Sequence, residues 1–542
     1  MPSLYQENVS AISEQRQRLI RKALPRIEEN LHVHRDAHLA KISKGKIALD
    51  TPGWVRVNPA PPVSDHDRSF RLCVGFRNSG CEYRESDPKK LGCLNCGYYA
   101  GTAFENVDGE ILLTQLQSAI RTAAKECTPY NAIEFLNDGS FLNPREFDRE
   151  TQKALFSLVA QMPHIKRVLI ESRANYIKSD SITFLLSCLR PDQRLEVGIG
   201  FESADDFVRE VCINKGSSRK AFERAIQVLQ TIQADEGKER VAILAYLLIK
   251  PAFLTPKESV EDIILTLKYF AGLQDRSGIE IIPKLEPAAI VDGTILSLLY
   301  AEKSSPFYYE PLNYWATLEI LARTYSIPEI RRYCGTIRIG AREDMDDIVV
   351  VPAVYDEHGK FDPFDYVLYD AIQKYNQHHD VHKLFAVITG VFNSRIKGSM
   401  ANYCSLLGWY NNAEIEQRGI VYFLDVESDK ISAAAKSLFT QMETRFLIVA
   451  WDAMNGIEGL DEDHLDYYQA IKAAFDSEEP EDIKKHQIGE AVKKIFHRVD
   501  PRMVVQPKIN VLSQADAGQK EIFLDVKDLL RNTKYSLWCR LS

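Results

Sequence analysis

Short apolar runs alternate with amphipathic segments from about residue 70 to residue 325 of the chain. The runs have the length of strands, and the segments between them repeat their apolar residues with the 3.6-residue period of a helix. This alternation is typical of parallel strands that are buried on both faces by crossover helices. The expected strands are 70–76, 132–137, 167–172, 195–202, 241–250 and 279–287, and the expected helices are 112–127, 145–162, 180–190, 218–233, 258–273 and 313–325.

Six such units predict an α/β fold built on a partial (βα)6 TIM-like barrel. In βα barrels the active site lies at the carboxyl ends of the strands, so the residues that follow each strand are the candidate site residues. We expect three regions: an N-terminal helical extension over 1–64, the barrel over 65–330, and a C-terminal domain over 335–542.

The C-terminal region mixes strand-like segments, at 346–356, 419–426, 445–454 and 503–512, with helix-like ones at 433–442 and 481–496. It predicts an additional α/β or α+β domain. Because six strands leave a barrel open along one side, we expect this domain to close over the barrel mouth. The alternative is an independent domain on a flexible hinge. His378 and His382 have the i, i+4 spacing of metal ligands, but the run lacks the glutamate of HExxH, and a solvated helix end is the preferred interpretation.

Composition narrows the function classes. The 542 residues are 45% hydrophobic and 26% charged, and the formal net charge of −9 argues against a general nucleic-acid binder. The sequence contains no apolar run of membrane-spanning length and begins too polar for a signal peptide, so we expect a cytoplasmic protein with no membrane partner. Most of its cysteines are scattered singly, as expected of buried thiols in a reducing compartment. The basic residues before residue 45 read as an exposed helix.

Three cysteines carry the strongest chemical signal. Cys81, Cys93 and Cys96 follow the first expected strand, and the last two form a CxxC pair flanked by glycines. Three thiolates on a four-iron, four-sulfur cluster leave one iron open to an external ligand. The alternative is a zinc knuckle in which Cys73 supplies the fourth thiolate. We expect Cys73 to point into packing within the first strand instead.

Five segments in order resemble the radical S-adenosylmethionine superfamily over residues 65 to 325. The chain looks most like the branch that contains the archaeosine tRNA-modification radical enzyme, and the Elongator catalytic subunit is a more distant relative. The segments are the cysteine loop ending at Tyr99, NDGSFLNPREF at 137–147, LIESRANYI at 169–177, VGIGFESADDFVREVCINKG at 197–216 and AYLLIKPAFLTPKESVED at 245–262.

The resemblance implies a radical SAM enzyme with a 4Fe-4S cluster on Cys81, Cys93 and Cys96 and with S-adenosyl-L-methionine as cofactor. The cluster reductively cleaves the cofactor to a 5′-deoxyadenosyl radical, which abstracts hydrogen from a substrate. It also implies an electron donor such as flavodoxin or ferredoxin, and a tRNA nucleoside as substrate. A small metabolite or a carrier-bound intermediate is the alternative substrate, which the acidic balance favours. A non-catalytic zinc-binding interaction module is the remaining class.

The same resemblance assigns the cofactor contacts. Many relatives have an aromatic residue before the third cysteine, where this chain has Asn95, so Tyr98 or Tyr99 is expected to meet the adenine instead. An ordinary turn is the alternative for the segment after the second strand, and a mutual ion pair is the alternative for Glu171 and Arg173. Solvated positions are the alternative for Arg209 and Lys215. The expected cofactor-binding residues are Tyr98, Asn137, Asp138, Gly139, Ser140, Glu171, Arg173, Glu202, Arg209, Lys215 and Lys250.

Overall fold

The computed structural model describes residues 10–42, 48–60, 69–103, 105–125, 129–237, 240–302, 305, 307–309, 314–340, 363–390, 479–499, 505–515, 519–528 and 533–541. The chain divides into two compact units. The first contains residues 1–379 and 405–434, and the second contains 380–404 and 435–542. The expected segments 346–356, 419–426, 433–442 and 445–454 lie outside the described residues.

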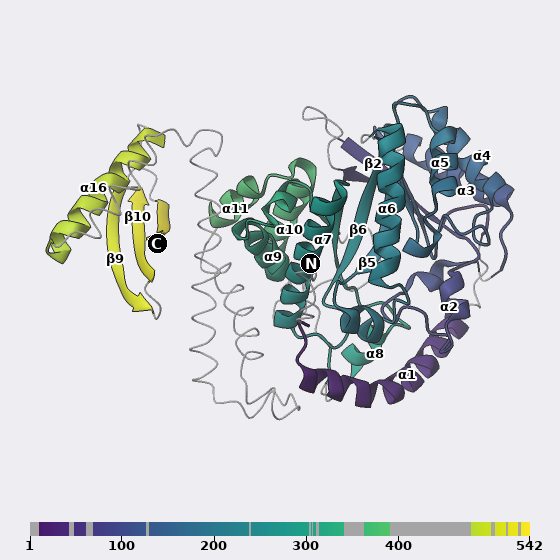
Figure 1. The fold of residues 1–542 in the computed structure, drawn as a ribbon, viewed down its shortest axis with the longest axis horizontal. Coiled ribbons are helices and arrows are strands. Elements are labelled where there is room, and N and C mark those ends of the chain that lie inside the picture. The colour runs from purple at the N-terminus through teal and green to yellow at the C-terminus, as the bar shows by residue number, and fades with distance from the viewer. Residues whose placement is uncertain are drawn as a thin grey trace. The chain divides into compact units, whose positions relative to one another are not determined.

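The first unit is built on one curled, eight-stranded half-barrel sheet whose strands follow one another in chain order (Figure 1). The first strand pairs antiparallel with the second, and every later neighbour is parallel. The predicted partial barrel is therefore confirmed. The strands are β1 (Trp54–Ala60), β2 (Ser69–Phe76), β3 (Ala132–Asn137), β4 (Arg167–Glu171), β5 (Arg194–Glu202), β6 (Val241–Ile249), β7 (Ile281–Pro287) and β8 (Arg338–Ile339).

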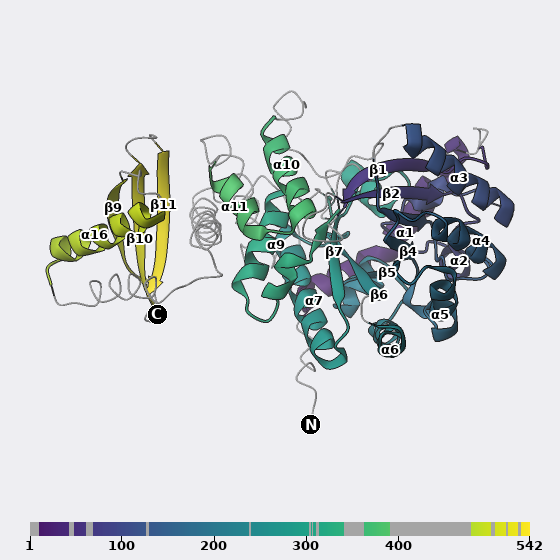
Figure 2. The ribbon, with the colours of Figure 1, turned by 90° about the horizontal axis from the view of Figure 1, so that it is seen from above.

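Helices connect the strands and lie around the outside of the sheet (Figure 2). Several begin at the capping residues that the sequence provides: Thr255 and Glu258 form a reciprocal capping box at the start of α7, which ends at Gly278 in the left-handed conformation. The helices of this unit within the described residues are α1 (Glu14–Ile42), α2 (Glu82–Ser86), α3 (Gly109–Lys125), α4 (Arg149–Ala160), α5 (Ser179–Cys188), α6 (Arg219–Glu236), α7 (Pro256–Ser277), α8 (Ile295–Ala301), α9 (Tyr314–Ser326) and α10 (Pro363–His378).

The two faces of the barrel sheet differ in polarity. The face toward the helices is apolar: Phe135 of β3 packs on Phe156 of α4 with ring centroids 5.9 Å apart. The next residue back, Glu134, points to the other face, where its carboxylate accepts a 2.8 Å hydrogen bond from Arg71. Glu196 of β5 also lies on this inner face and is 2% exposed. The inner face is thus also buried, but it carries paired charges beside apolar residues, which the expectation of apolar strands did not include.

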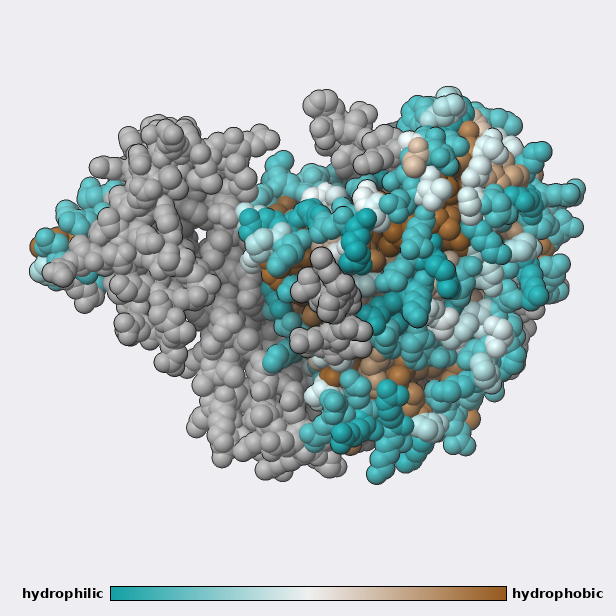
Figure 3. All heavy atoms as spheres, viewed as in Figure 1, coloured by the Kyte–Doolittle hydropathy of each residue, from teal (hydrophilic) through white to brown (hydrophobic). Residues whose placement is uncertain are grey.

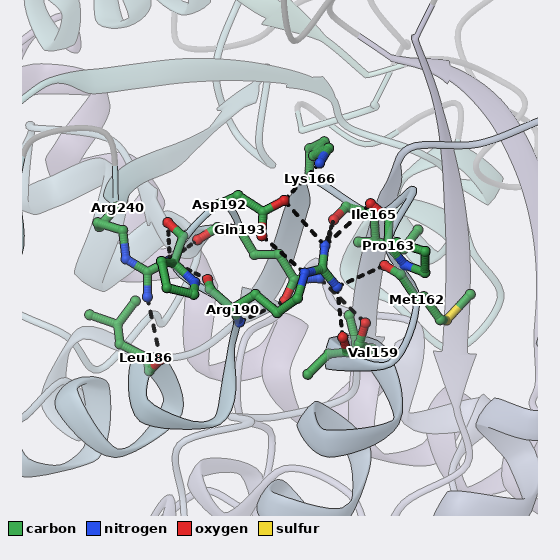
Figure 4. Close-up of polar contacts among 12 residues, drawn as sticks. Val159, Met162, Pro163, Ile165, Lys166, Leu186, Arg190, Asp192, Gln193 and Arg240 are labelled. Atoms are coloured by element: carbon green, nitrogen blue, oxygen red, sulfur yellow. Dashed lines mark hydrogen bonds and ion pairs between the residues drawn. The ribbon is translucent and has the colours of Figure 1, made fainter.

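Two arginines organise the amino-terminal ends of β4, β5 and β6 (Figure 4). Arg190 donates to the carbonyl groups of Ala160 and Met162, at 2.6 and 3.0 Å, beyond the end of α4. Arg240 donates to the carbonyl groups of Leu186 and Pro191 at 3.4 and 3.1 Å. These guanidinium groups bind carbonyls at the helix ends and turns, where fewer backbone donors are available than inside a helix.

The second unit contains a helix and a three-stranded antiparallel sheet among its described residues. The strands β9 (Val505–Ala515), β10 (Gln519–Asp528) and β11 (Thr533–Leu541) pair in the order β11-β10-β9. Helix α16 (Glu481–Val499) precedes them, and α11 (Val381–Gly390) also belongs to this unit. The strand expected at 503–512 and the helix expected at 481–496 are both present, as parts of β9 and α16.

Hydrophilic residues cover most of the described surface on the face shown in Figure 3. Within the described residues, no helix is long and apolar enough to cross a membrane.

Candidate functional site

The three cysteines lie on the loop that follows β2, at the carboxyl end of the sheet. Cys81 directly precedes α2, and the Cys96 amide donates to the Cys93 carbonyl at 3.2 Å to close the CxxC turn. Gly92, before the turn, has a left-handed φ of 59°, and an added Cβ there would lie 3.0 Å from the Cβ of Arg84. A glycine is therefore needed where the turn packs on α2.

The thiols are close enough to affect one another's ionisation. Burial, followed by the nearby Asp138, raises the pKa of Cys81 to about 11, and Glu146 and Cys93 also raise it. Burial likewise raises the pKa of Cys96, with further contributions from Asp138, Cys93 and Cys81. Metal ligation requires thiolates, so a bound positive centre has to offset the effect of burial on these cysteines.

Among the described residues, no three histidine, cysteine or acidic side chains converge on one ion position. Cys73, the fourth ligand of the zinc alternative, is fully buried in β2, and its thiol lies 3.8 Å from the Glu134 carboxylate on the inner face of the sheet.

Asp138, just after β3, lies against the cysteine loop. Its Oδ1 is 4.0 Å from the Cys96 sulfur, and its Oδ2 is 3.3 Å from Nη1 of Arg84. Its backbone carbonyl accepts a 3.0 Å hydrogen bond from Asn78. Burial raises the pKa of Asp138, although Arg84 opposes that effect. The residue thus connects the loop after β3 to the cysteines.

Glu146 joins these two loops and was not predicted. Its carboxylate accepts hydrogen bonds from the backbone amides of Ser140 and Glu82, the latter at 3.0 Å, and from the Asn143 side chain at 2.9 Å. Gly139 has a φ of 119°, and a Cβ there would lie 1.9 Å from Oε2 of Glu146. Burial raises the pKa of Glu146 to about 7. Its place in the segment NDGSFLNPREF was the available signal.

Two side-chain amides at the mouth have both of their polar atoms buried and without a hydrogen-bond partner among the described residues. They belong to Asn137, the last residue of β3, and to Asn95, between the second and third cysteines. A buried amide without a partner costs free energy unless a ligand supplies one. Asn137 is one of the expected cofactor-binding residues, and its unsatisfied amide is consistent with that role.

Glu171 and Arg173 follow β4 but have separate partners. Burial raises the pKa of Glu171 to about 7, and the nearby Tyr246 on the inner face opposes that effect. The Arg173 guanidinium donates to the carbonyls of Lys215 and Gly216 at 2.7 and 2.8 Å. It also lies 4.0 Å from the ring centroid of Tyr83. The ion pair that was the alternative interpretation does not join these two groups.

Glu202 ends β5 with a left-handed φ of 69°, and its carboxylate accepts a 2.7 Å bond from Lys215. An added Cβ at Gly200 would lie 2.3 Å from the Lys215 nitrogen, so this pair lies over the inner face of β5. Arg209 is 1% exposed and donates to the carbonyls of Ser203 and Ser217, both at 2.9 Å. It braces the loop after β5, and its contact with a cofactor stays a prediction.

Lys250 follows β6 with a left-handed φ of 55° and is 3% exposed. Its ammonium lies 4.0 Å from the ring centroid of Tyr309, whose hydroxyl donates to the Lys250 carbonyl at 2.9 Å. Tyr98 is 54% exposed, whereas Tyr99 is 2% exposed and packs within the protein. Of the two tyrosines expected near the adenine, only Tyr98 has a ring accessible to a ligand.

The histidine spacing near residue 380 does not form one helical face. Helix α10 ends at His378 and α11 begins at Val381, so His378 and His382 lie on different helices. The interpretation of a helix end, rather than of an HExxH-like metal site, agrees with this break.

The chain is similar to several archaeal proteins. It is 29% identical over 280 residues to an uncharacterized protein of Methanocaldococcus jannaschii. The matched region covers 51% of this chain and 71% of that protein. It is 28% identical over 313 residues to archaeosine synthase subunit beta of Methanosarcina acetivorans, covering 56% of this chain and 84% of the relative. Archaeosine synthase subunit beta of Thermococcus kodakarensis is 28% identical over 229 residues, covering 42% of this chain and 65% of the relative. No protein-family model matches the chain.

Two solved structures align at low similarity. An N-terminally deleted Elp3 of Methanocaldococcus infernus is 14% identical over 79% of this chain and 73% of its own, with a TM-score of 0.33. The radical S-adenosylmethionine methyltransferase TsrM of Kitasatospora setae is 10% identical over 69% of this chain and 60% of its own, with a TM-score of 0.30. The sequence relatives confirm the predicted resemblance: this chain is a distant relative of archaeosine synthase subunit beta, the branch that its motifs indicated.

Proposed function

We propose that the chain is a radical SAM enzyme that binds a 4Fe-4S cluster through Cys81, Cys93 and Cys96 and acts on a nucleoside of tRNA. The observation that carries this proposal is the position of three mutually interacting thiols at the carboxyl end of a parallel half-barrel. Active sites of βα barrels lie at that end. When bound, the cluster supplies the electron that cleaves S-adenosylmethionine to a 5′-deoxyadenosyl radical.

The chain's own residues bind and orient the cofactor in this proposal. Asn137 offers a buried amide with free donor and acceptor atoms at the end of β3. Gly139 lets the backbone approach closely, and Glu146 fixes that loop to the cysteine loop. The exposed ring of Tyr98 is available to the adenine. The other predicted contacts, Ser140, Glu171, Arg173, Glu202, Arg209, Lys215 and Lys250, remain proposals of the same kind.

The tRNA substrate is supported by the names of the relatives, two of which are archaeosine synthase subunits. The electron donor is proposed to be a flavodoxin or ferredoxin, because one-electron reduction of such a cluster requires a low-potential partner.

The cluster is tested by anaerobic reconstitution followed by iron and sulfide analysis and by electron paramagnetic resonance of the reduced protein. We expect a four-iron cluster in the wild type, and loss of its iron in Cys81→Ala, Cys93→Ala and Cys96→Ala. Cys73→Ala and Cys188→Ala are the matched controls and keep their iron. Equal iron loss in Cys73→Ala and Cys93→Ala would contradict the ligand assignment.

The reaction is tested by adding dithionite and S-adenosylmethionine to the reconstituted protein and measuring 5′-deoxyadenosine by chromatography. We expect slow formation without substrate and faster formation with bulk tRNA. A nuclease digest of the same tRNA is the control and gives no stimulation. No nucleoside at full cluster occupancy would refute a radical enzyme, and stimulation by small metabolites instead of tRNA would refute the substrate class.

A further inference from the structure

Helix α1 packs across the carboxyl ends of the barrel strands instead of standing free in solvent (Figure 1). Arg16, near its start, pairs with Glu258 at 2.7 Å, at the beginning of the helix that follows β6. His34, two turns before its end, lies 3.1 Å from Ser297 of α8, in the connection after β7. Ile20 and Leu31 of α1 itself are fully buried. The expectation of an exposed N-terminal helix is therefore wrong for this face of α1.

Arg35 is the buried charge on this helix, with 5% of its surface exposed. Its Nε donates to the Gly293 carbonyl at 3.1 Å, in the connection after β7, and its Nη1 donates to the Leu91 carbonyl in the cysteine loop. Its guanidinium carbon also lies 4.8 Å from the ring centroid of Tyr99. The planar, preorganised fork of an arginine can hold several such groups at once, which a lysine cannot.

These contacts flank the CxxC pair on both sides. Leu91 precedes Cys93 by two positions and Tyr99 follows Cys96 by three. The Tyr99 ring also lies near a second guanidinium group, because Arg84 is 5.6 Å from its centroid. An added Cβ at Gly293 would lie 1.9 Å from the Tyr99 hydroxyl oxygen, so the ring is also packed tightly against the connection after β7.

We propose that Arg35 is a positioning residue for the cysteine loop, and that α1 is thereby a structural part of the cluster site. The proposal rests on the proposed function for the identity of the cluster. Arg35 acts through the segment between Leu91 and Tyr99: it fixes that segment to the connection after β7 and so holds two of the three thiols in place. A helix that only stabilised the barrel would need its apolar contacts but no buried guanidinium in this loop.

The test uses full-length protein with Arg35→Met and Arg35→Lys, and with Arg26→Met on the exposed face of the same helix as the control. The first readout is amide hydrogen exchange of the protein without metal. Since charged hydrogen bonds are lost, Arg35→Met should raise exchange of residues 91–99 about tenfold while strands β3 to β6 stay protected. Arg35→Lys should have an intermediate effect, and Arg26→Met should match the wild type.

The second readout is the rate at which the reconstituted protein loses iron to a chelator, which should rise about tenfold in Arg35→Met. Unchanged exchange of residues 91–99 would overturn the proposal, and so would faster exchange spread equally through the barrel strands, because that result marks a general stabilising role. If the wild type binds no cluster, the proposed function fails, while the exchange measurement still decides whether Arg35 orders the cysteine loop.

Discussion

Replacing Glu196 with glutamine should locally destabilise the inner face of the barrel. Both carboxylate oxygens accept bonds from Arg338 of β8 at 2.8 Å, and Arg167 of β4 lies 3.6 Å away. Removing one charge of a buried pair costs about 3–5 kcal/mol, because it leaves the partner charge uncompensated. Glutamine keeps the shape and one acceptor, so we expect a cost near the lower end of that range.

The assay is native-state hydrogen exchange of β4, β5 and β8, since a chain of two units does not promise a single unfolding transition. Glu280→Gln is the matched control: Glu280 is half-exposed and pairs with Arg194 at 3.0 Å, so it should cost at most about 1 kcal/mol. Adding Arg338→Met to Glu196→Gln should restore part of the loss. Equal costs for the buried and the exposed substitution would refute the reasoning.

The same pair predicts a pH dependence. Burial raises the pKa of Glu196, but Arg338 and then Arg167 outweigh burial and hold that pKa below its ordinary value. A carboxyl whose folded-state pKa is lowered contributes stability that is present above the unfolded-state pKa and is lost as the pH falls toward the folded-state value. Protection of β5 and β8 should therefore decrease in acid in the wild type, and Glu196→Gln should remove that decrease.

Three further substitutions test other parts of the structure. Gly139→Ala should place a methyl group against Glu146 at a positive φ and cost about 1–3 kcal/mol, measured as faster exchange of residues 138–147; unchanged exchange would contradict the close approach. Arg240→Met removes charged hydrogen bonds to carbonyls and should cost about 2 kcal/mol of local stability around residues 186–193. Arg224→Met, on the exposed face of α6, is the control and should cost almost nothing. Equal effects of the two substitutions would contradict the role of the Arg240 hydrogen bonds. Burial raises the pKa of Glu171 to about 7, so its neutral form is favoured in the folded state and stability should fall as the pH rises from about 4 to 7. Opening free energies of β4 from native-state hydrogen exchange should fall less in Glu171→Gln than in the wild type, and parallel pH profiles of the two proteins would contradict the raised pKa.

The fold was predictable because the outer face of the sheet follows local rules. Strand β3 has the sequence AIEFLN, in which Ile133 and Phe135 alternate with Glu134. Because most of its residues are apolar, the segment is predicted to be a buried strand. The pairing of the inner face was not predictable by the same route. Glu196 and Arg338 are 142 positions apart, and the curl of the sheet brings them together.

The cysteine site was predictable because its residues are close in sequence and have a specific spacing. Its supports were harder to find. Glu146 lies in the segment NDGSFLNPREF but was expected to be part of the helix over 145–162. Arg35 lies in a basic helix that was expected to be exposed to solvent. No local pattern marks one arginine of seven basic residues on α1 as buried, since its partners lie in two loops distant along the chain. The expected cofactor roles at the other strand ends stay predictions.

The antiparallel strand β1 has a consequence for self-association. An open half-barrel exposes edge backbone groups, and such an edge is a template on which a second chain can add a strand and start aggregation. In β1, Pro59 pairs with Phe70 of β2 and has no N–H to donate. An incoming strand therefore finds no backbone donor at that position, which makes β1 a poorer template. Pro59 thus disfavours growth of the barrel sheet into a continuous intermolecular sheet.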